Sequence, residues 1–195
     1  MSKKESTFFN MISTLLIITI IAGASLGFVN KITAGPKAKA KLERKIKALK
    51  LVLPEFTNNP VADLVLVKSE YAKDSVEIYP ALNQNQKVGM AIIGSSKKGF
   101  SGLIKLMIGF KQDGTIKNIA VLEQKETPGL GTKMIDEKYV KQYRDKDPSK
   151  FNLKVKKDGG EIDALTGATI TSRAYSEAVQ MAYGEFLKRE KAKDK

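Results

Sequence analysis

The chain contains no cysteine, no histidine and no tryptophan among its 195 residues. The first two absences exclude thiolate nucleophiles, disulfides, iron–sulfur ligation by cysteine, Cys/His zinc sites and imidazole-based catalytic triads. We expect no metal site in this chain, and no catalytic residue if a cofactor carries the chemistry. Any redox chemistry has to come from a bound organic cofactor.

Acidic residues are also scarce, because 21 Asp and Glu stand against 34 Lys and Arg, which gives a formal net charge of +13. Such an excess can indicate nucleic-acid binding, but here the basic residues are spread along the chain and are not interleaved with aromatic residues. We expect no nucleic-acid partner. The surface of a bilayer that carries anionic lipid is a better partner for this charge.

The N-terminal segment is apolar and long enough to cross a membrane. Residues 8–29 contain no charge, and at a rise of about 1.5 Å per residue they span a hydrocarbon layer of roughly 30 Å. A cleavable signal peptide is the alternative, with Lys3 and Lys4 as its basic start and the Ala-Gly-Ala of residues 22–24 as its cleavage site. A retained single-pass anchor over residues 1–30 is favoured because the apolar run continues past that site.

A basic segment, residues 31–54, follows the anchor. Its apolar residues recur at helical spacing among Lys and Arg: Leu42, Ile46, Leu49 and Leu53. We predict an amphipathic helix that ends before Pro54. Two interpretations of it are equal, namely a helix on an anionic membrane surface and an ordinary first helix with a solvated basic face. By the positive-inside rule, these basic residues would keep the following domain in the cytoplasm.

Residues 55–195 have room for one domain, and their pattern predicts an α+β fold with an antiparallel β-sheet flanked by helices. We expect strands at residues 61–67, 75–79 and 88–93, and a β-hairpin of residues 103–111 and 116–122 with one buried face. A helix over 132–144, a strand over 151–155 and a final helix should follow. The final helix carries an apolar stripe of Tyr175, Ala178, Ala182 and Phe186.

The segment from residue 163 to residue 172, Asp-Ala-Leu-Thr-Gly-Ala-Thr-Ile-Thr-Ser, places the hydroxyl of Thr169 behind two very small residues, Gly167 and Ala168. A helix predicted to begin near Ser172 would point free N–H groups and its positive dipole end toward a phosphate on that hydroxyl. Taken alone, the segment is also explained as a strand-to-helix turn with Thr171 or Ser172 as the N-cap.

A second unusual segment, residues 126–131, reads Glu-Thr-Pro-Gly-Leu-Gly. Pro128 fixes one backbone angle, while Gly129 and Gly131 permit conformations that other residues resist, so the loop can be rigid and run flush against a flat ring. It is not a dinucleotide fingerprint, because the third glycine is missing. A tight turn after the hairpin is the alternative interpretation.

Together, the apolar run, the Glu-Thr-Pro-Gly-Leu-Gly loop and the Thr-Gly-Ala-Thr motif resemble the covalently flavinylated FMN-binding subunits of bacterial redox pumps. The chain looks like the G subunit of the Rnf electron transport complex, and less like the C subunit of the sodium-translocating NADH:quinone reductase. The resemblance implies that a flavin transferase moves FMN from FAD onto Thr169 as a phosphoester. Thr166 then opens the modification motif and Asp163 is its preceding acid.

The resemblance also implies roles in the loop. Leu130 is expected to contact the isoalloxazine face, and Glu126 and Thr127 to bond to its polar edge or to brace the loop. Many relatives have a histidine shortly before this Glu, but residues 122–125 here read Leu-Glu-Gln-Lys. No role of that histidine can be transferred to this chain.

The function implied is an electron relay in an ion-translocating ferredoxin:NAD oxidoreductase complex, with the other subunits of the complex as partners. The family places the domain on the extracytoplasmic, periplasmic side of the inner (cytoplasmic) membrane, and we follow it against the count of positive residues. The alternatives are a C-type subunit of a sodium-translocating NADH:quinone reductase, a membrane-tethered FMN-binding sensor, and an assembly module without redox chemistry.

Overall fold

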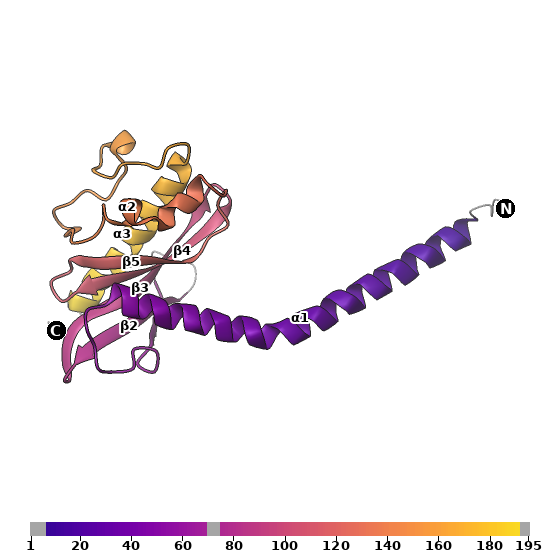
Figure 1. The fold of residues 1–195 in the computed structure, drawn as a ribbon, viewed down its shortest axis with the longest axis horizontal. Helices are drawn as coiled ribbons and strands as arrows, with labels where there is room; N and C mark the ends of the chain where they lie inside the picture. The colour runs from indigo at the N-terminus through magenta and orange to yellow at the C-terminus, as the bar shows by residue number, and fades with distance from the viewer. Residues whose placement is uncertain (1–6, 70–74, 192–195) are drawn as a thin grey trace. The chain divides into compact units, whose positions relative to one another are not determined.

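The computed structural model describes residues 7–69 and 75–191 (Figure 1). In order, its elements are α1 (Phe8–Val52), β1 (Val65–Val67), β2 (Val76–Asn83), β3 (Gln86–Gly99), β4 (Gly102–Lys111), β5 (Ile116–Glu123), η1 (Gly131–Ile135), α2 (Glu137–Val140), η2 (Lys156–Asp158) and α3 (Thr169–Lys191). Contacts divide the chain into two compact units, Met1–Glu43 and Arg44–Lys195. Lys3 and Lys4 lie outside the described residues.

The strands form one antiparallel sheet in the order β1-β2-β3-β4-β5, so each strand pairs with its neighbour in the sequence. The turn between β4 and β5 uses Gly114 at φ 85°, a left-handed conformation that glycine adopts at little cost. The predicted α+β class is confirmed, and each predicted strand up to β5 has a counterpart in the sheet. β3 is much longer than the predicted 88–93, because it pairs along its length with β4.

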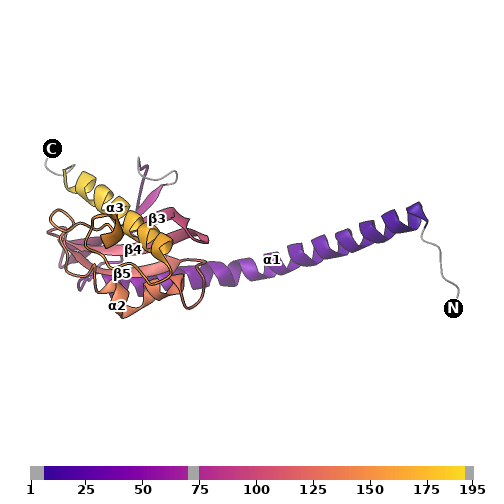
Figure 2. The same ribbon diagram turned by 90° about the horizontal axis from the view of Figure 1, so that it is seen from above.

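Helices cover both faces of this sheet, so the predicted single buried face of the hairpin is incomplete. On one face, Ile104, Leu106, Ile108 and Phe110 pack with residues of α3, and Figure 2 shows α3 lying along the sheet over β3 and β4. On the other face, Met107 packs against the last turn of α1. The alternation along β4 places Met107 on the face predicted to be exposed. Met107 is buried instead, because a helix that is distant in the sequence covers this face.

Two glycines allow this close helix packing, one on each face. A Cβ on Gly94 would lie 2.0 Å from the backbone oxygen of Ala178 in α3, and one on Gly109 would lie 1.9 Å from that of Val52 in α1. The predicted stripe of the final helix is confirmed, because Tyr175, Ala178, Ala182 and Phe186 are all buried. The sheet therefore holds α3, and the first turn of this helix borders the candidate site.

Two predictions between β5 and α3 are wrong. The predicted helix 132–144 is broken into η1 and α2, because Asp136 between them is extended at φ −68° and ψ 140°, and Ile135 is 58% exposed. The predicted strand 151–155 is a loop with one isolated bridge from Val155 to Ile162. The side chains that face the core in this loop are Phe151, Leu153 and Val155, and they alternate with exposed residues as in a strand. The loop does not pair with any strand of the sheet within the described residues.

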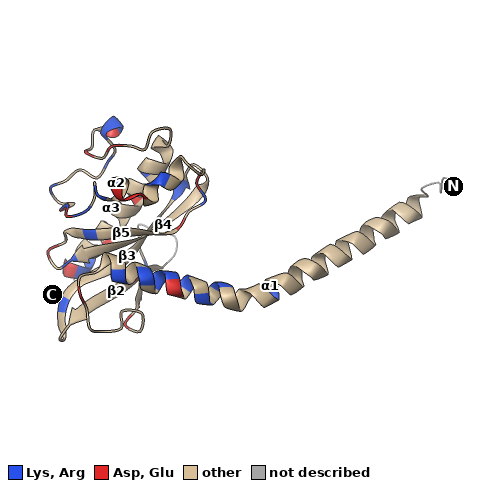
Figure 3. Cartoon of the chain, in the orientation of Figure 1, with Lys and Arg blue, Asp and Glu red and all other residues tan. Residues whose placement is uncertain are grey.

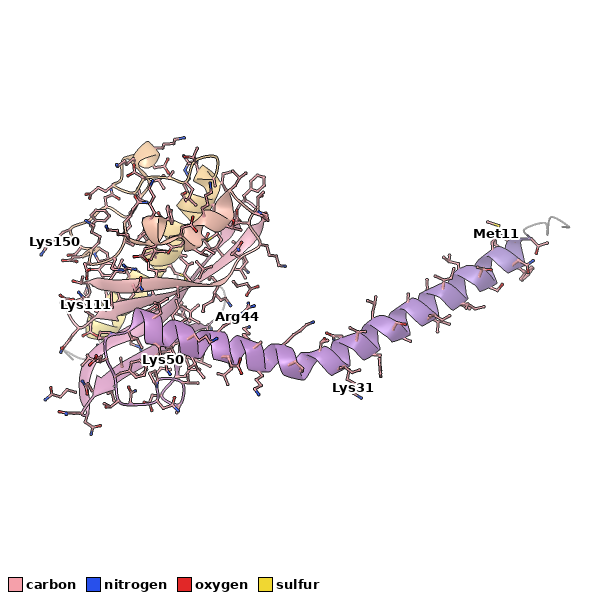
Figure 4. All side chains as sticks on the ribbon, in the orientation of Figure 1. Met11, Lys31, Arg44, Lys50, Lys111 and Lys150 are labelled. Atoms are coloured by element: carbon pink, nitrogen blue, oxygen red, sulfur yellow. The ribbon has the colours of Figure 1, made fainter. Side chains whose placement is uncertain are left out.

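α1 is one continuous helix through the predicted anchor and most of the basic segment. Within the described residues it is the one helix long and apolar enough to cross a membrane, and the qualifying window is fully exposed. Charged side chains begin after its first half, at Lys31, and continue to Arg44 and Lys50 near its end (Figures 3 and 4). The division at residues 30 and 54 stays a prediction.

The end of α1 belongs to the second compact unit, which begins at Arg44. Leu49 and Leu53 are buried beside the sheet, whereas Leu42 and Ile46 are 46% and 38% exposed. The helix ends two residues before Pro54, as the ring of proline requires. The last turns of the predicted linker helix thus belong to the domain and cover one face of its sheet.

Candidate cofactor-binding site

Both unusual sequence segments border one cavity of about 380 Å³. The loop 126–131 forms one wall and the segment 167–171 forms another. The complete lining is Phe100, Glu126, Thr127, Leu130, Gly131, Lys157, Gly167, Ala168, Thr169, Ile170 and Thr171. The volume lies in the usual range of small-molecule sites, about 300–1,000 Å³.

Thr169 is the first residue of α3, so the helix begins three residues before the predicted start. Neither Thr171 nor Ser172 is the N-cap. The Ser172 hydroxyl instead donates to the Ala168 carbonyl at 3.0 Å and accepts the Leu165 N–H at 2.9 Å, which holds the chain against the helix start. Thr169 therefore sits within the first turn.

This end of α3 can hold a phosphate. The first N–H groups of a helix have no carbonyl partner in the helix, and the positive end of the helix dipole attracts an anion. No acidic residue occupies the first turn. Lys157 lines the same cavity and adds a positive charge that the sequence analysis did not include.

An ion pair fixes the loop that carries Lys157. The Arg173 guanidinium in α3 donates two hydrogen bonds of 2.7 Å to Asp158, and these bonds lower the pKa of the Asp158 carboxyl. The next residue, Gly159, reverses the chain at φ 78°. The paired residues are 15 apart in the sequence, a separation that no local pattern reveals.

Three exposed apolar side chains give the cavity a surface suited to a flat aromatic ring. Phe100 is 69% exposed, Ile170 48% and Leu130 44%. Of these, the sequence analysis identified Leu130. Phe100 sits in the turn between β3 and β4, where a large exposed aromatic residue between Gly99 and Gly102 was the available signal.

Glycines bring the two motifs into contact. Gly167 has φ 74°, and a Cβ there would lie 3.3 Å from a methyl group of Leu130. Gly129 has φ 75°, and its N–H donates to the Thr132 hydroxyl at 2.9 Å. Gly129 shapes the loop, while Gly131 is part of the cavity wall.

Asp163 and Thr166 lie elsewhere. They border a second cavity of about 650 Å³, together with Lys133, Asp136, Lys138, Tyr139, Gln142, Ala164 and Leu165. The Asp163 carboxylate pairs with Lys156 at 2.8 Å, and its backbone N–H and carbonyl both bond to the side chain of Gln142. The structure thus separates the first residues of the modification motif from Thr169.

Comparisons with known proteins define the class first. Residues 99–184 match the family model of the FMN-binding domain, and this range includes every residue that lines the first cavity. The solved structure of NqrC from Shewanella oneidensis is similar over 62% of this chain and 63% of its own, with a TM-score of 0.47 and 22% identity.

Relatives then define the family. The G subunit of the ion-translocating oxidoreductase complex of Shewanella amazonensis is 34% identical over 82% of this chain and 79% of its own length. The G subunit of the Na⁺-translocating ferredoxin:NAD⁺ oxidoreductase complex of Acetobacterium woodii is 30% identical over 86% of each. The chain belongs to the family of G subunits of ion-translocating oxidoreductase complexes, and the predicted resemblance and FMN as the cofactor are confirmed.

Proposed function

We propose that this chain is the flavin-carrying electron relay of a membrane-bound ferredoxin:NAD oxidoreductase complex, with FMN tethered to Thr169 through a phosphoester. The names of the relatives support the complex, and the FMN-binding domain supports the cofactor. The observation that supports a tether at Thr169 is the first cavity, because Thr169, the start of α3, Lys157 and the apolar loop residue Leu130 all line it.

Each residue has a definite part in holding the group. Thr169 would provide the oxygen of the tether. The first-turn N–H groups of α3 and Lys157 would hold its phosphate, and Leu130 and Ile170 would provide apolar surface for the ring. FMN, when bound, supplies the electron-transfer chemistry, and the protein supplies its position. No residue of the chain has to act as an acid or a base during the relay.

Attachment is a phosphoryl transfer in which Thr169 is the acceptor. The Thr169 oxygen forms a bond to the phosphorus of the FMN half of FAD, the pyrophosphate bond breaks, and AMP leaves. The hydroxyl proton passes to a base of the flavin transferase. A covalent tether suits an electron carrier outside the cytoplasm, because a reversibly bound flavin would be lost there by dilution.

The test is a pair of matched threonine variants, expressed with a flavin transferase. Thr169→Ala should abolish the flavin fluorescence of the denatured chain in a gel, because the Thr171 hydroxyl in the same turn is buried and donates to Glu126. Thr166→Ser, which keeps a hydroxyl in the second cavity, should retain it. Covalent flavin in Thr169→Ala would refute the assignment, and a colourless parent chain would favour an assembly role.

We also propose the location. Residues 1–30 anchor the chain in the inner membrane, residues 31–54 link it, and the FMN-binding domain from residue 55 lies on the periplasmic side. Protease added to spheroplasts should digest the domain while cytoplasmic markers stay intact. Protection of the domain until the membrane is broken would show that the basic residues after the anchor determine the topology, and release of a soluble protein would indicate signal cleavage.

A further inference from the structure

Glu126 is buried in a loop of which residues 127–130 are exposed. Its exposure is 5%, while the neighbouring Lys125 and Thr127 are exposed. A carboxylate taken out of water is costly unless hydrogen bonds replace its solvation. The partners of this carboxylate therefore indicate why it is there.

Both oxygens of Glu126 accept hydrogen bonds from other walls of the first cavity. Oε1 accepts the backbone N–H of Ser101 at 3.0 Å, and Oε2 accepts the hydroxyl of Thr171 at 2.6 Å. Ser101 follows Phe100 in the turn between β3 and β4, and Thr171 lies two residues after Thr169 in α3. One side chain thus connects three segments that are distant in the sequence.

Two glycines make the space in which this carboxylate sits. A Cβ on Gly131 would lie 2.8 Å from Oε2 of Glu126 and 2.9 Å from the Thr171 oxygen. A Cβ on Gly99 would lie 2.7 Å from Oε1. A Cβ on Gly131 would also lie 2.7 Å from the Cβ of Glu126, so a side chain at this last glycine of the loop would disturb the seat of Glu126.

We infer that Glu126 is a positioning residue that locks the β3–β4 turn, the loop and the first turn of α3 into one arrangement. The inference rests on the proposed function, because the purpose of the lock is to present Thr169 and its neighbouring N–H groups to a phosphate. Glu126 lines the cavity, but both of its oxygens are engaged by the protein, so its part is to hold the walls of the cavity together.

The lock predicts a difference between two substitutions. Glu126→Ala removes both bonds and leaves the buried Thr171 hydroxyl and the Ser101 N–H without this acceptor. Glu126→Gln keeps the shape, because its amide oxygen accepts from Ser101 and its amide nitrogen donates to the Thr171 hydroxyl, which both donates and accepts. If Glu126 acts by positioning the three segments, Glu126→Gln should behave like the parent chain. If Glu126 acts through its charge, Glu126→Gln should behave like Glu126→Ala.

The first measurement is hydrogen–deuterium exchange of the full-length chain in detergent, with Thr169→Ala present in every sample so that no FMN is attached at that residue. Glu126→Ala should raise exchange about tenfold or more in peptides that contain Ser101, because the Ser101 amide loses its hydrogen bond to a charged group. Glu126→Gln should stay within about threefold of the parent.

The second measurement restores Thr169 and follows the rate of FMN loading by a flavin transferase, which should fall about tenfold in Glu126→Ala and be retained in Glu126→Gln. Ser96→Ala is the matched control, because it removes the 2.7 Å bond from β3 to Glu177 of α3 away from the cavity. It should leave both readouts unchanged.

The outcomes separate the lock from the tether. Unchanged exchange at Ser101 in Glu126→Ala, or loss of loading in Glu126→Gln as large as in Glu126→Ala, would overturn the lock. If Glu126→Ala does not fold, Thr171→Val breaks the α3 bond alone and Thr171→Ser should restore it. Raised exchange in Glu126→Ala, together with a Thr169-containing parent chain that the transferase never loads with FMN, would contradict the tether and leave the lock standing.

Discussion

The two cavities that flank the modification motif differ in chemistry. The first has exposed apolar side chains, one lysine, the start of α3 and one carboxylate, Glu126, whose two oxygens are already bonded to Ser101 and Thr171. The second has side chains of both charges, including Lys133, Asp136, Lys138 and Asp163. A flat ring with a phosphate fits the first arrangement, because apolar surface and an anion site lie side by side there.

The division between them falls inside the motif itself. Thr166 borders the second cavity, whereas Gly167 and Thr169 border the first. Gly167, at φ 74°, is the point where the chain turns from one to the other. A short sequence motif can thus serve two surfaces, and its residues need not share a function.

Substitution of two neighbouring lysines, one at each cavity, should give the largest difference in the rate of FMN loading. Lys157 lines the first cavity, while Lys156 pairs with Asp163 at the second. Lys157→Ala should slow FMN loading about tenfold, because it removes a charge worth about 1–2 kcal/mol to a nearby phosphate. Lys156→Ala should change the loading rate much less.

The rates are measured by in-gel fluorescence over time with a fixed amount of transferase. Equal losses in the two lysine variants would show that net charge, and not the geometry of the first cavity, controls loading. A loss confined to Lys156→Ala would assign loading to the second cavity.

A smaller effect should come from the apolar wall. Leu130→Ala should shift the absorption spectrum or the midpoint potential of the bound flavin, because it replaces apolar contact with water, but attachment should continue. Ile135→Ala is the control, since Ile135 is similarly exposed but does not line the cavity. An unchanged spectrum and potential in Leu130→Ala would make the loop a structural turn.

The smallest effect concerns the ion pair behind Lys157. Arg173 lowers the pKa of Asp158, so the pair stabilises the fold above the ordinary carboxyl value of 3.8 and loses this contribution as the pH falls through the lowered pKa. Asp158→Asn should therefore lower the melting temperature slightly at pH 7 and match the parent in strong acid.

Thermal melts from pH 7 down to about pH 2 measure this difference. Arg173→Met should reproduce it, and the double variant should add nothing further, because both changes break the same pair. A difference that persists at the acid limit would mean that Asp158 acts through another contact.

The sequence was most informative where one periodicity continues over many residues. The strands of the hairpin and the stripe of α3 were predicted because each alternates or repeats against a single continuous surface. Residues 132–144 kept a helical spacing in Tyr139 and Tyr143, which are both buried, but the extended Asp136 breaks the helix before them. Periodicity reports which side chains are buried and not whether the backbone between them is continuous.

The site was predicted at the level of motifs and not at the level of contacts. Thr169 and Leu130 were identified from two motifs rich in small and turn-forming residues, and their roles from the resemblance that these motifs carry. Lys157 was not, because its place depends on the Asp158–Arg173 pair, which the fold assembles from separate segments. The hydrogen bonds from Ser101 and Thr171 to Glu126 could not be predicted for the same reason, because they join residues that are distant in the sequence.

The central claim, that the first cavity holds FMN covalently at Thr169, is tested most directly by mass spectrometry of the chain purified from its native membrane. The tether predicts a peptide containing residues 167–171 that is heavier by one FMN less water, with fragment ions that place the added mass on Thr169. The same peptide at its unmodified mass, or the flavin mass on Thr166 in the second cavity, would contradict the account.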